Sequence, residues 1–201
     1  MIFATGNKHK LREMGELLPG VELEPLPDGV ELPPEDGESF AEIALEKARA
    51  AHAATGEPAI ADDSGIGAVA LGGAPGIYSA RYGGEGASDE ENLEKLLREV
   101  AAAGEERGAY YVCALALVEA DGGEHVFEAR CEGRLIEGAR GEGGFGYDPA
   151  FVPDATGPDD ERTYSELSQA EKNEISHRGL AARLLAGHLE VSAGGAAPAG
   201  R

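Results

Sequence analysis

The sequence contains no tryptophan and only two cysteines in 201 residues. Cys113 and Cys131 are too few for a disulfide framework, and both lie in apolar, strand-like surroundings, so we expect reduced core side chains. No apolar run approaches the roughly 18 residues that a membrane span requires, and Met1 leads directly into an apolar strand. We therefore expect a cytoplasmic protein that has no membrane partner.

Positive charge is also scarce. The 17 lysines and arginines face 38 aspartates and glutamates, so the formal net charge is −21 at pH 7. Nucleic-acid backbones are bound mainly by cations, and this balance excludes a protein whose main partner is a nucleic acid. A small anionic ligand at a local cationic site is compatible with it. Such acidity is typical of adaptation to high salt, with an ordinary acidic protein as the alternative.

The hydrophobic pattern indicates a single unit over residues 1–190, followed by a disordered tail at 191–201. Strands are expected at 2–5, 21–26 and 58–61, and helices at 11–18, 39–55, 88–100 and from 176 onward. Two longer β-rich runs, 110–118 and 124–136, are joined at Asp121-Gly122-Gly123, the strongest hairpin signal of the chain. The expected fold class is α/β, a mixed sheet with an elongated antiparallel hairpin.

Three expected helices have specific features. Capping boxes begin two of them, Ser39 with Glu42 and Ser88 with Glu91. The last helix, beginning at Ser176, is expected to bury one face made of Leu180, Ala181, Leu184 and His188.

Thr5-Gly6-Asn7 follows the first strand and precedes the first helix. Backbone N–H groups at such a turn favour an anion, Asn7 can cap the helix or bind a phosphate, and Lys10 adds a positive charge one turn later. An ordinary capped strand-turn-helix is the alternative explanation.

Asp62 and Asp63 follow a buried strand-like run and precede Ser64-Gly65. Carboxylates at the end of a buried strand are costly unless they are paired or bind a metal, so they mark a candidate active site, and an Asx turn is the alternative. We assign Asp63 to the cleft because the strand is expected to turn there, and Asp62 to a supporting role. Glu35 is the best partner for a magnesium site.

Other polar and aromatic residues have both a functional and a structural interpretation. Lys47 lies on an otherwise apolar helix face, where it either meets an anion or extends to the edge of the core. The segment 144–149 presents Phe145 and Tyr147, which either stack on a base or pack in the core. His177 and Arg178 begin the last helix, where they either contact phosphate or carbonyl oxygens or simply occupy the surface.

Together these motifs resemble the inosine/xanthosine triphosphate pyrophosphatase family. The motifs, in family order, are 4–10, 61–65, 72–82, 143–149, Lys172 and 176–178. The resemblance extends from residue 2 to about residue 188 and implies two lobes flanking a substrate cleft, a homodimer, and Mg²⁺ as cofactor. It implies hydrolysis of deaminated purine nucleoside triphosphates, such as ITP, dITP and XTP, to the monophosphate and pyrophosphate.

The resemblance also implies residue roles. Asp63 would accept a proton and bind the metal, with Glu35 as the other metal carboxylate. The remaining substrate contacts are Thr5, Gly6, Asn7 and Lys10 on the triphosphate, Lys47 and Ser64 beside it, and Phe145, Gly146, Tyr147, Asp148, Lys172, His177 and Arg178 around the nucleoside. Ile43, Val69 and Pro34 depart from residues frequent in the family, and Pro34 weakens the metal assignment of Glu35 more than that of Asp63.

Two other functions are compatible with these residues. One is a pyrophosphatase of the same architecture that acts on other modified or pyrimidine nucleotides. The other is a non-catalytic nucleotide sensor, which would use the phosphate turn but would have no need for Asp63 and Glu35 together.

The net charge generates a prediction about salt. We expect the unfolding midpoint to rise as KCl increases from about 0.1 M to about 2 M, because screening reduces self-repulsion and salt favours apolar burial. Thermal unfolding followed by circular dichroism measures this. A midpoint that stays flat or falls across the series would make the acidity incidental.

Overall fold

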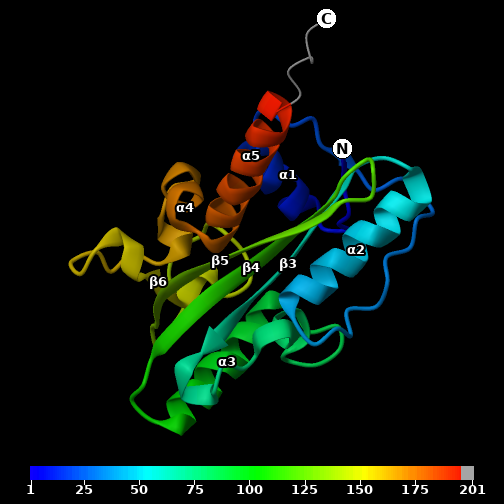
Figure 1. Ribbon diagram of the computed structural model, residues 1–201. Helices are drawn as coiled ribbons and strands as arrows, with labels where there is room; N and C mark the ends of the chain where they lie inside the picture. The colour runs from blue at the N-terminus through cyan, green and yellow to red at the C-terminus, as the bar shows by residue number, and fades with distance from the viewer. Residues whose placement is uncertain (196–201) are drawn as a thin grey trace, which may run out of the picture.

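The computed structural model describes residues 1–195. Its strands form one six-stranded sheet in the order β2-β1-β3-β4-β5-β6 (Figure 1). The strands are β1 (Ile2–Phe3), β2 (Glu24–Pro25), β3 (Ala59–Ala68), β4 (Gly108–Val118), β5 (Glu124–Leu135) and β6 (Phe151–Pro153). β1 is parallel to β2 and β3, whereas the β3–β4, β4–β5 and β5–β6 pairs are antiparallel. The expected α/β class, mixed sheet and long hairpin are confirmed.

Helices cover both faces of this sheet. They are α1 (Lys8–Leu17), α2 (Phe40–Thr55), α3 (Asp89–Ala103), α4 (Gln169–Ile175) and α5 (His177–Gly195). Figure 1 shows α2 on one side of the long strands, α1 and α5 on the other, and α3 near their opposite end. Within residues 1–195 no helix has the length and apolar character needed to cross a bilayer.

The two faces of β4 contact different helices because side chains alternate along a strand. Ala114 and Ala116 share a core with alanines of α2, and these small side chains allow the helix to lie close to the sheet. Leu115 and Leu117 pack on the other side, with residues of α1 and α5. Cys113 is buried in that second core and Cys131 near α3, and both thiols are free, as expected.

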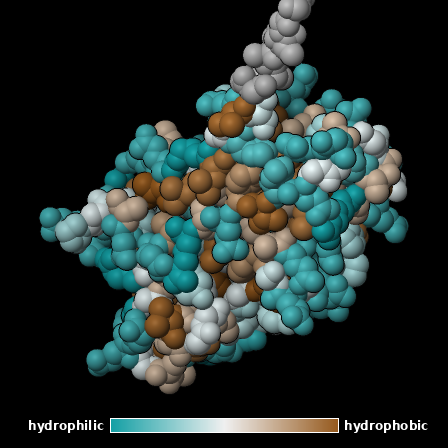
Figure 2. All heavy atoms as spheres, viewed as in Figure 1, coloured by the Kyte–Doolittle hydropathy of each residue, from teal (hydrophilic) through white to brown (hydrophobic). Residues whose placement is uncertain are grey.

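A third core lies at the other end of the long strands. It contains Leu93 and Leu96 of α3 together with Tyr111, Phe151 and Tyr164. The long strands β3, β4 and β5 thus run from one group of helices to another, which gives the molecule its two ends. Hydrophilic residues cover most of the face shown in Figure 2.

The expected end of the third strand is wrong. β3 does not turn at Ser64 but continues to Ala68, and Asp62 and Asp63 lie inside it as buried residues. Gly65 allows this continuation beside a neighbouring segment, because a Cβ there would lie 2.4 Å from the hydroxyl oxygen of Ser79. Cations from other elements compensate the two carboxylates, so their burial does not end the strand.

Other expectations need smaller corrections. The second strand covers only Glu24–Pro25, not 21–26. The capping box of Ser88 is confirmed, whereas the one at Ser39 is half right: Ser39 accepts from the backbone N–H of Glu42, but the Glu42 carboxylate accepts from that of Glu38.

The C-terminal region also differs from expectation. α4 is not among the helices expected from the sequence, and Leu184, expected on the buried face of the last helix, is 51% exposed. Ala182 and Leu185 are buried instead, because the helix face that packs in the core is shifted by one residue from the expected face. α5 continues to Gly195, beyond the expected start of the tail at 191, and residues 196–201 lie outside the described residues.

Candidate active site

A cavity of about 270 Å³ lies beside β3, between the two ends of the long strands. Most of the site residues that the sequence predicts line this cavity, namely Asn7, Lys10, Glu35, Asp63, Ser64, Phe145, Gly146, Tyr147, Asp148, His177 and Arg178. Thr5, Gly6, Lys47 and Lys172 do not line this cavity. Of these four, Lys47 binds two carboxylates that do, and Lys172 lines a neighbouring hollow on which Phe145 also borders.

The early end of β1 creates this site. β1 pairs with β3 only at Ala59 and Ile60, and the segment 74–79 bonds to the same edge from Ile66 onward, so the stretch between them lacks a neighbour on that side. Side chains from both faces of a strand can reach a ligand at such an open edge. Asp63 and Ser64 therefore both line the cavity although they point to opposite faces, which replaces the expected turn as the explanation.

One charged cluster joins α2 to β3 at this edge. The Lys47 ammonium lies 2.9 Å from the Glu35 carboxylate and 3.1 Å from that of Asp63. Burial raises the pKa of Asp63, and the cations Lys47 and Lys10 only partly oppose this effect. Burial also acts on Glu35, but Lys47, Lys10 and Arg81 outweigh it, so the pKa of Glu35 is lowered. Burial thus dominates at Asp63 and favours its protonation, whereas the nearby cations dominate at Glu35 and keep it ionised.

A second cluster surrounds Asp62 on the opposite face of β3. Lys10 lies 2.9 Å from the Asp62 carboxylate, and the Arg178 guanidinium lies 3.4 Å from it. Arg178 also donates to Glu13 at 2.7 Å and to the Ser64 hydroxyl at 2.8 Å. Burial favours a raised pKa for Asp62, but Lys10, Arg178 and Lys47 lower it to about 2. Asp62 is therefore a structural anion, which agrees with its expected supporting role.

The turn before α1 has the cap that its sequence indicates. Asn7 is the N-cap, and its side-chain oxygen accepts from the backbone N–H groups of His9 and Lys10. The hydroxyl of Thr5 accepts from the Asn7 N–H, which fixes the turn. Of the two expected roles of Asn7, the structure shows helix capping. Open space surrounds Gly6, where an added Cβ would meet no atom within 4 Å.

The glycine-rich segment places an aromatic ring over this charged region. The buried Asp148 carboxylate accepts from the Phe145 N–H and from Lys172, at 3.1 and 2.8 Å. Gly144 permits this geometry, since it has a φ of 72° and a Cβ there would lie 2.3 Å from the Asp148 carboxylate. The cationic groups of Lys172 and Arg178 each lie 5.3 Å from the centre of the Phe145 ring.

Tyr111 holds His177 against the cavity. The two rings are stacked, with centroids 4.5 Å apart and planes at 3°. Burial, together with the charges of Arg178, Lys172 and Lys10, places the pKa of His177 well below its ordinary value, so the imidazole is neutral. Its Nδ1 atom is buried without a hydrogen-bond partner among the described residues.

Three residues that organise the site are not among those predicted from the sequence. Glu13 binds Arg178 and Lys172, Tyr111 binds Asp148 and stacks on His177, and Arg81 binds Glu35. Glu13 looks like one more acid on a helix surface of this acidic chain. Tyr111 looks like an ordinary strand residue. Only Arg81, within the motif 72–82, carried a sequence signal.

Comparison with known proteins agrees with this geometry. The model of the Ham1 family matches residues 1–188. The chain belongs to the Ham1 family. It is 46% identical over 195 residues to a dITP/XTP pyrophosphatase of Geobacter sulfurreducens, covering 94% of this chain and 96% of that protein.

Two further relatives support this membership. A dITP/XTP pyrophosphatase of Thermus thermophilus is 47% identical over 189 residues, covering 92% of this chain and 89% of that protein. The structure of a HAM1 protein from Coxiella burnetii superposes with a TM-score of 0.84 at 40% identity, covering 94% and 98% of the two chains. The Ham1 match confirms the family resemblance drawn from the motifs.

The donor set of the Ham1 chain fits a hard divalent cation. The carboxylates of Asp63 and Glu35 converge on one point, because both bind the same ammonium nitrogen of Lys47. Magnesium prefers carboxylate oxygens and binds through one or two carboxylates together with substrate phosphates. The Glu35 side chain is 38% exposed and can therefore move toward an ion that enters from solvent.

The Asp62 cluster generates a prediction about acid stability. A carboxyl whose pKa is lowered by folding stabilises the protein above its unfolded pKa, and this contribution is lost as the pH falls from about 4 to about 2. It amounts to about 2 kcal/mol for Asp62. Asp62→Asn should be less stable than wild type at pH 6, and the difference should narrow by about this amount near pH 2.

Urea unfolding at pH 6, 4 and 2.5 measures the difference in the free energy of unfolding between wild type and Asp62→Asn. Asp28→Asn, which changes an exposed carboxylate, serves as the control and should follow the wild type at each pH. A constant difference between Asp62→Asn and wild type would contradict the assignment of Asp62 as a buried structural anion.

Proposed function

We propose that this chain hydrolyses deaminated purine nucleoside triphosphates, ITP, dITP and XTP, to the nucleoside monophosphate and pyrophosphate. The observation that carries this proposal is the convergence of Asp63 and Glu35, both bound to Lys47 behind them, at a cavity that Phe145 and the first helix also border. The relatives of this chain in Geobacter sulfurreducens and Thermus thermophilus are named dITP/XTP pyrophosphatases, which supports the same reaction here.

The triphosphate would bind between the first turn and the cationic side chains. Lys10 provides positive charge at the cavity wall, and the N-terminus of α1 adds backbone N–H groups and the positive end of the helix dipole. The open space around Gly6 leaves room for phosphate oxygens next to the backbone. Thr5 and Asn7 would act by holding this turn in shape.

Asp63 would serve as the base of the reaction. Its raised pKa makes it a better proton acceptor than an ordinary aspartate, and it faces the cavity, where it would accept a proton from the attacking water. Lys47 would hold Asp63 and Glu35 in place through its two ion pairs. Mg²⁺, bound by Asp63 and Glu35, would supply neutralisation of phosphate charge and Lewis-acid activation.

The nucleoside would lie against Phe145, with His177 and Arg178 at its edge. Phe145 can stack on a planar purine. The Nδ1 atom of His177 has an unsatisfied hydrogen-bonding capacity, which a base or sugar would fill. Arg178 is already bound to Glu13, Asp62 and Ser64, so it would offer only its remaining N–H groups to the O6 acceptor of hypoxanthine or xanthine.

Other expectations for this protein stay predictions. The homodimer and the magnesium cofactor follow from the family resemblance. The cytoplasmic location and the adaptation to high salt follow from composition.

Replacing the proposed base tests the mechanism. Asp63→Asn should lower turnover at saturating Mg²⁺ by at least about a hundredfold, because an amide neither accepts the proton nor carries the metal-binding charge. Pyrophosphate release measures this, with Asp154→Asn, an exposed carboxylate, as the matched control. Retention of more than about a tenth of wild-type turnover would refute the role of Asp63.

A panel of triphosphates tests the substrate class. ITP and XTP should be cleaved well above ATP, since the N–H donors of Arg178 match O6 and oppose the 6-amino group of adenine. GTP shares O6, so its expected lower rate than ITP and XTP depends on its 2-amino group, and it should be cleaved at or above the rate of ATP. The measured quantity is kcat/KM for pyrophosphate release with Mg²⁺. Arg178→Ala should lower the ratio of kcat/KM for ITP to kcat/KM for ATP. If the wild-type enzyme cleaved ATP with the same kcat/KM as ITP, the proposed base recognition would be wrong. Nucleotide binding without any cleavage would favour a nucleotide sensor.

A further inference from the structure

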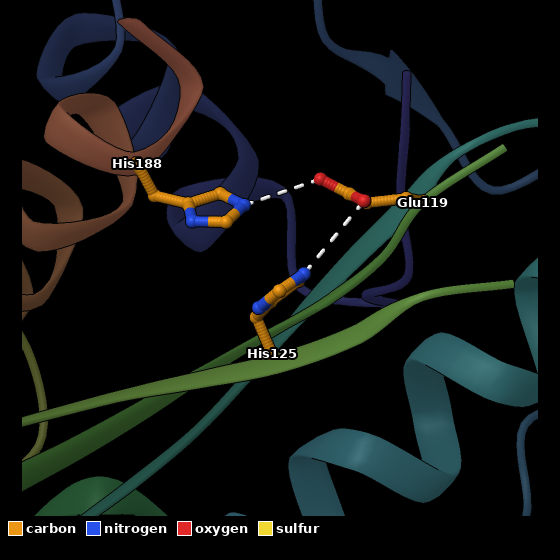
Figure 3. Close-up of side chains that lie close together, drawn as sticks. All are labelled: Glu119, His125 and His188. Atoms are coloured by element: carbon orange, nitrogen blue, oxygen red, sulfur yellow. Dashed lines mark hydrogen bonds and ion pairs between the residues drawn. The ribbon is translucent and has the colours of Figure 1, made fainter. Parts of the chain in front are cut away.

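A second group of polar side chains lies at the tip of the long hairpin, outside the cavity. Glu119 follows β4, His125 lies in β5, and His188 belongs to α5 (Figure 3). His188 is ten residues beyond Arg178 on the same helix, which places the two about 15 Å apart along its axis. None of the three lines the cavity, and the proposed hydrolysis does not use them.

The three side chains point toward one another from different elements. The Nε2 atom of His188 lies 3.1 Å from one carboxylate oxygen of Glu119, and that of His125 lies 3.7 Å from the other. Figure 3 shows the Glu119 carboxylate facing both imidazoles. One potential ligand atom from each residue lies within 4.8 Å of the others.

This spacing matches the coordination of a transition metal. Metal bonds of about 2.0–2.2 Å to nitrogen and oxygen in a tetrahedral site place neighbouring ligand atoms about 3.3 Å apart. The 3.1 Å from His188 Nε2 to one Glu119 oxygen is close to that value, and His125 Nε2 lies 3.7 Å from the other oxygen of the same carboxylate. Small rotations of side chains that are one quarter to one third exposed would bring all three onto one ion.

A purely ionic interpretation explains the group less well. The ring centroids of His125 and His188 are only 4.1 Å apart. Two protonated imidazoles at that separation would repel each other, whereas two neutral imidazoles can both offer a lone pair to one metal ion. A metal site therefore explains both the contacts of the two imidazoles with Glu119 and the close approach of the two rings.

We infer that Glu119, His125 and His188 form a site for a zinc-class divalent cation, separate from the active site. Two imidazoles and one carboxylate are ligands typical of zinc, whereas magnesium prefers oxygen ligands alone. With three protein ligands, one coordination position is left for water.

The backbone at the hairpin tip already holds the ligands in place. The N–H of Glu119 donates to the carbonyl of Gly123, and its own carbonyl accepts from Gly122, which has a φ of 86°. His125 pairs with Leu117 across the hairpin, and Phe127, two residues farther on the same face, packs close to His188. The bound ion would therefore connect the hairpin to α5 and stabilise the folded state by an amount that grows with the logarithm of its affinity.

Zinc binding to the untagged full chain tests this inference. Equilibrium dialysis in millimolar Mg²⁺, which competes at the oxygen-rich active site, should find one zinc per chain. His188→Gln and Glu119→Gln should each weaken this affinity at least tenfold, and zinc should raise the unfolding midpoint of wild type but not of either variant. His52→Gln, which removes a histidine outside the group, should bind zinc like wild type.

Two further measurements make the result decisive. Pyrophosphate release with Mg²⁺ should be the same in His188→Gln and wild type, which separates this site from the proposed active site. If His188→Gln does not fold, His125→Gln provides the same comparison from the strand side. Equal zinc affinity in wild type and the folded variants, or no zinc bound in the presence of Mg²⁺, would overturn the inference.

Discussion

The central constraint on this structure is the negative charge of Asp62 inside β3. Its side chain is fully buried, and a buried carboxylate without cations nearby would be strongly destabilising. Lys10 of α1 and Arg178 of α5 compensate it from opposite ends of the sequence. Both helices must therefore lie on the same side of the sheet, and Glu13 strengthens the arrangement by binding Arg178 from α1. The first and last helices thus meet beside the third strand.

This arrangement also produces the electrostatics of the cavity. Although the chain has a net charge of −21, three cations converge near the open edge of β3, namely Lys10, Lys47 and Arg178. They lower the pKa of Asp62 and of Glu35, although burial favours protonation of both carboxyls. A polyanionic substrate requires cationic groups close to its binding site, whereas solubility depends on the surface as a whole. The acidic exterior and a few cationic groups at the cavity are therefore compatible in one molecule.

The roles of neighbouring residues follow from the alternation of the strand. Asp62 and Asp63 are adjacent in sequence but point to opposite faces, where different cations surround them. Asp62 has a lowered pKa and Asp63 a raised one. The same residue type thus provides a structural anion at one position and a candidate base at the next. The short β1 makes the second accessible, because it leaves the edge of β3 open.

Local patterns in the sequence determined much of this protein. The α/β class, the long hairpin and the helix cap at Asn7 could be predicted, because capping, turn formation and side-chain alternation depend on residues close in sequence. Local patterns marked several cavity residues as candidates, and the family resemblance assigned most of them to one site. Only the tertiary structure decided that β3 continues through Asp62 and Asp63, that α5 buries Leu185 and exposes Leu184, and that Glu13 and Tyr111 support the site. Each of these depends on partners far away in sequence, since the cost of burying a charge or choosing a helix face is set by what packs against it.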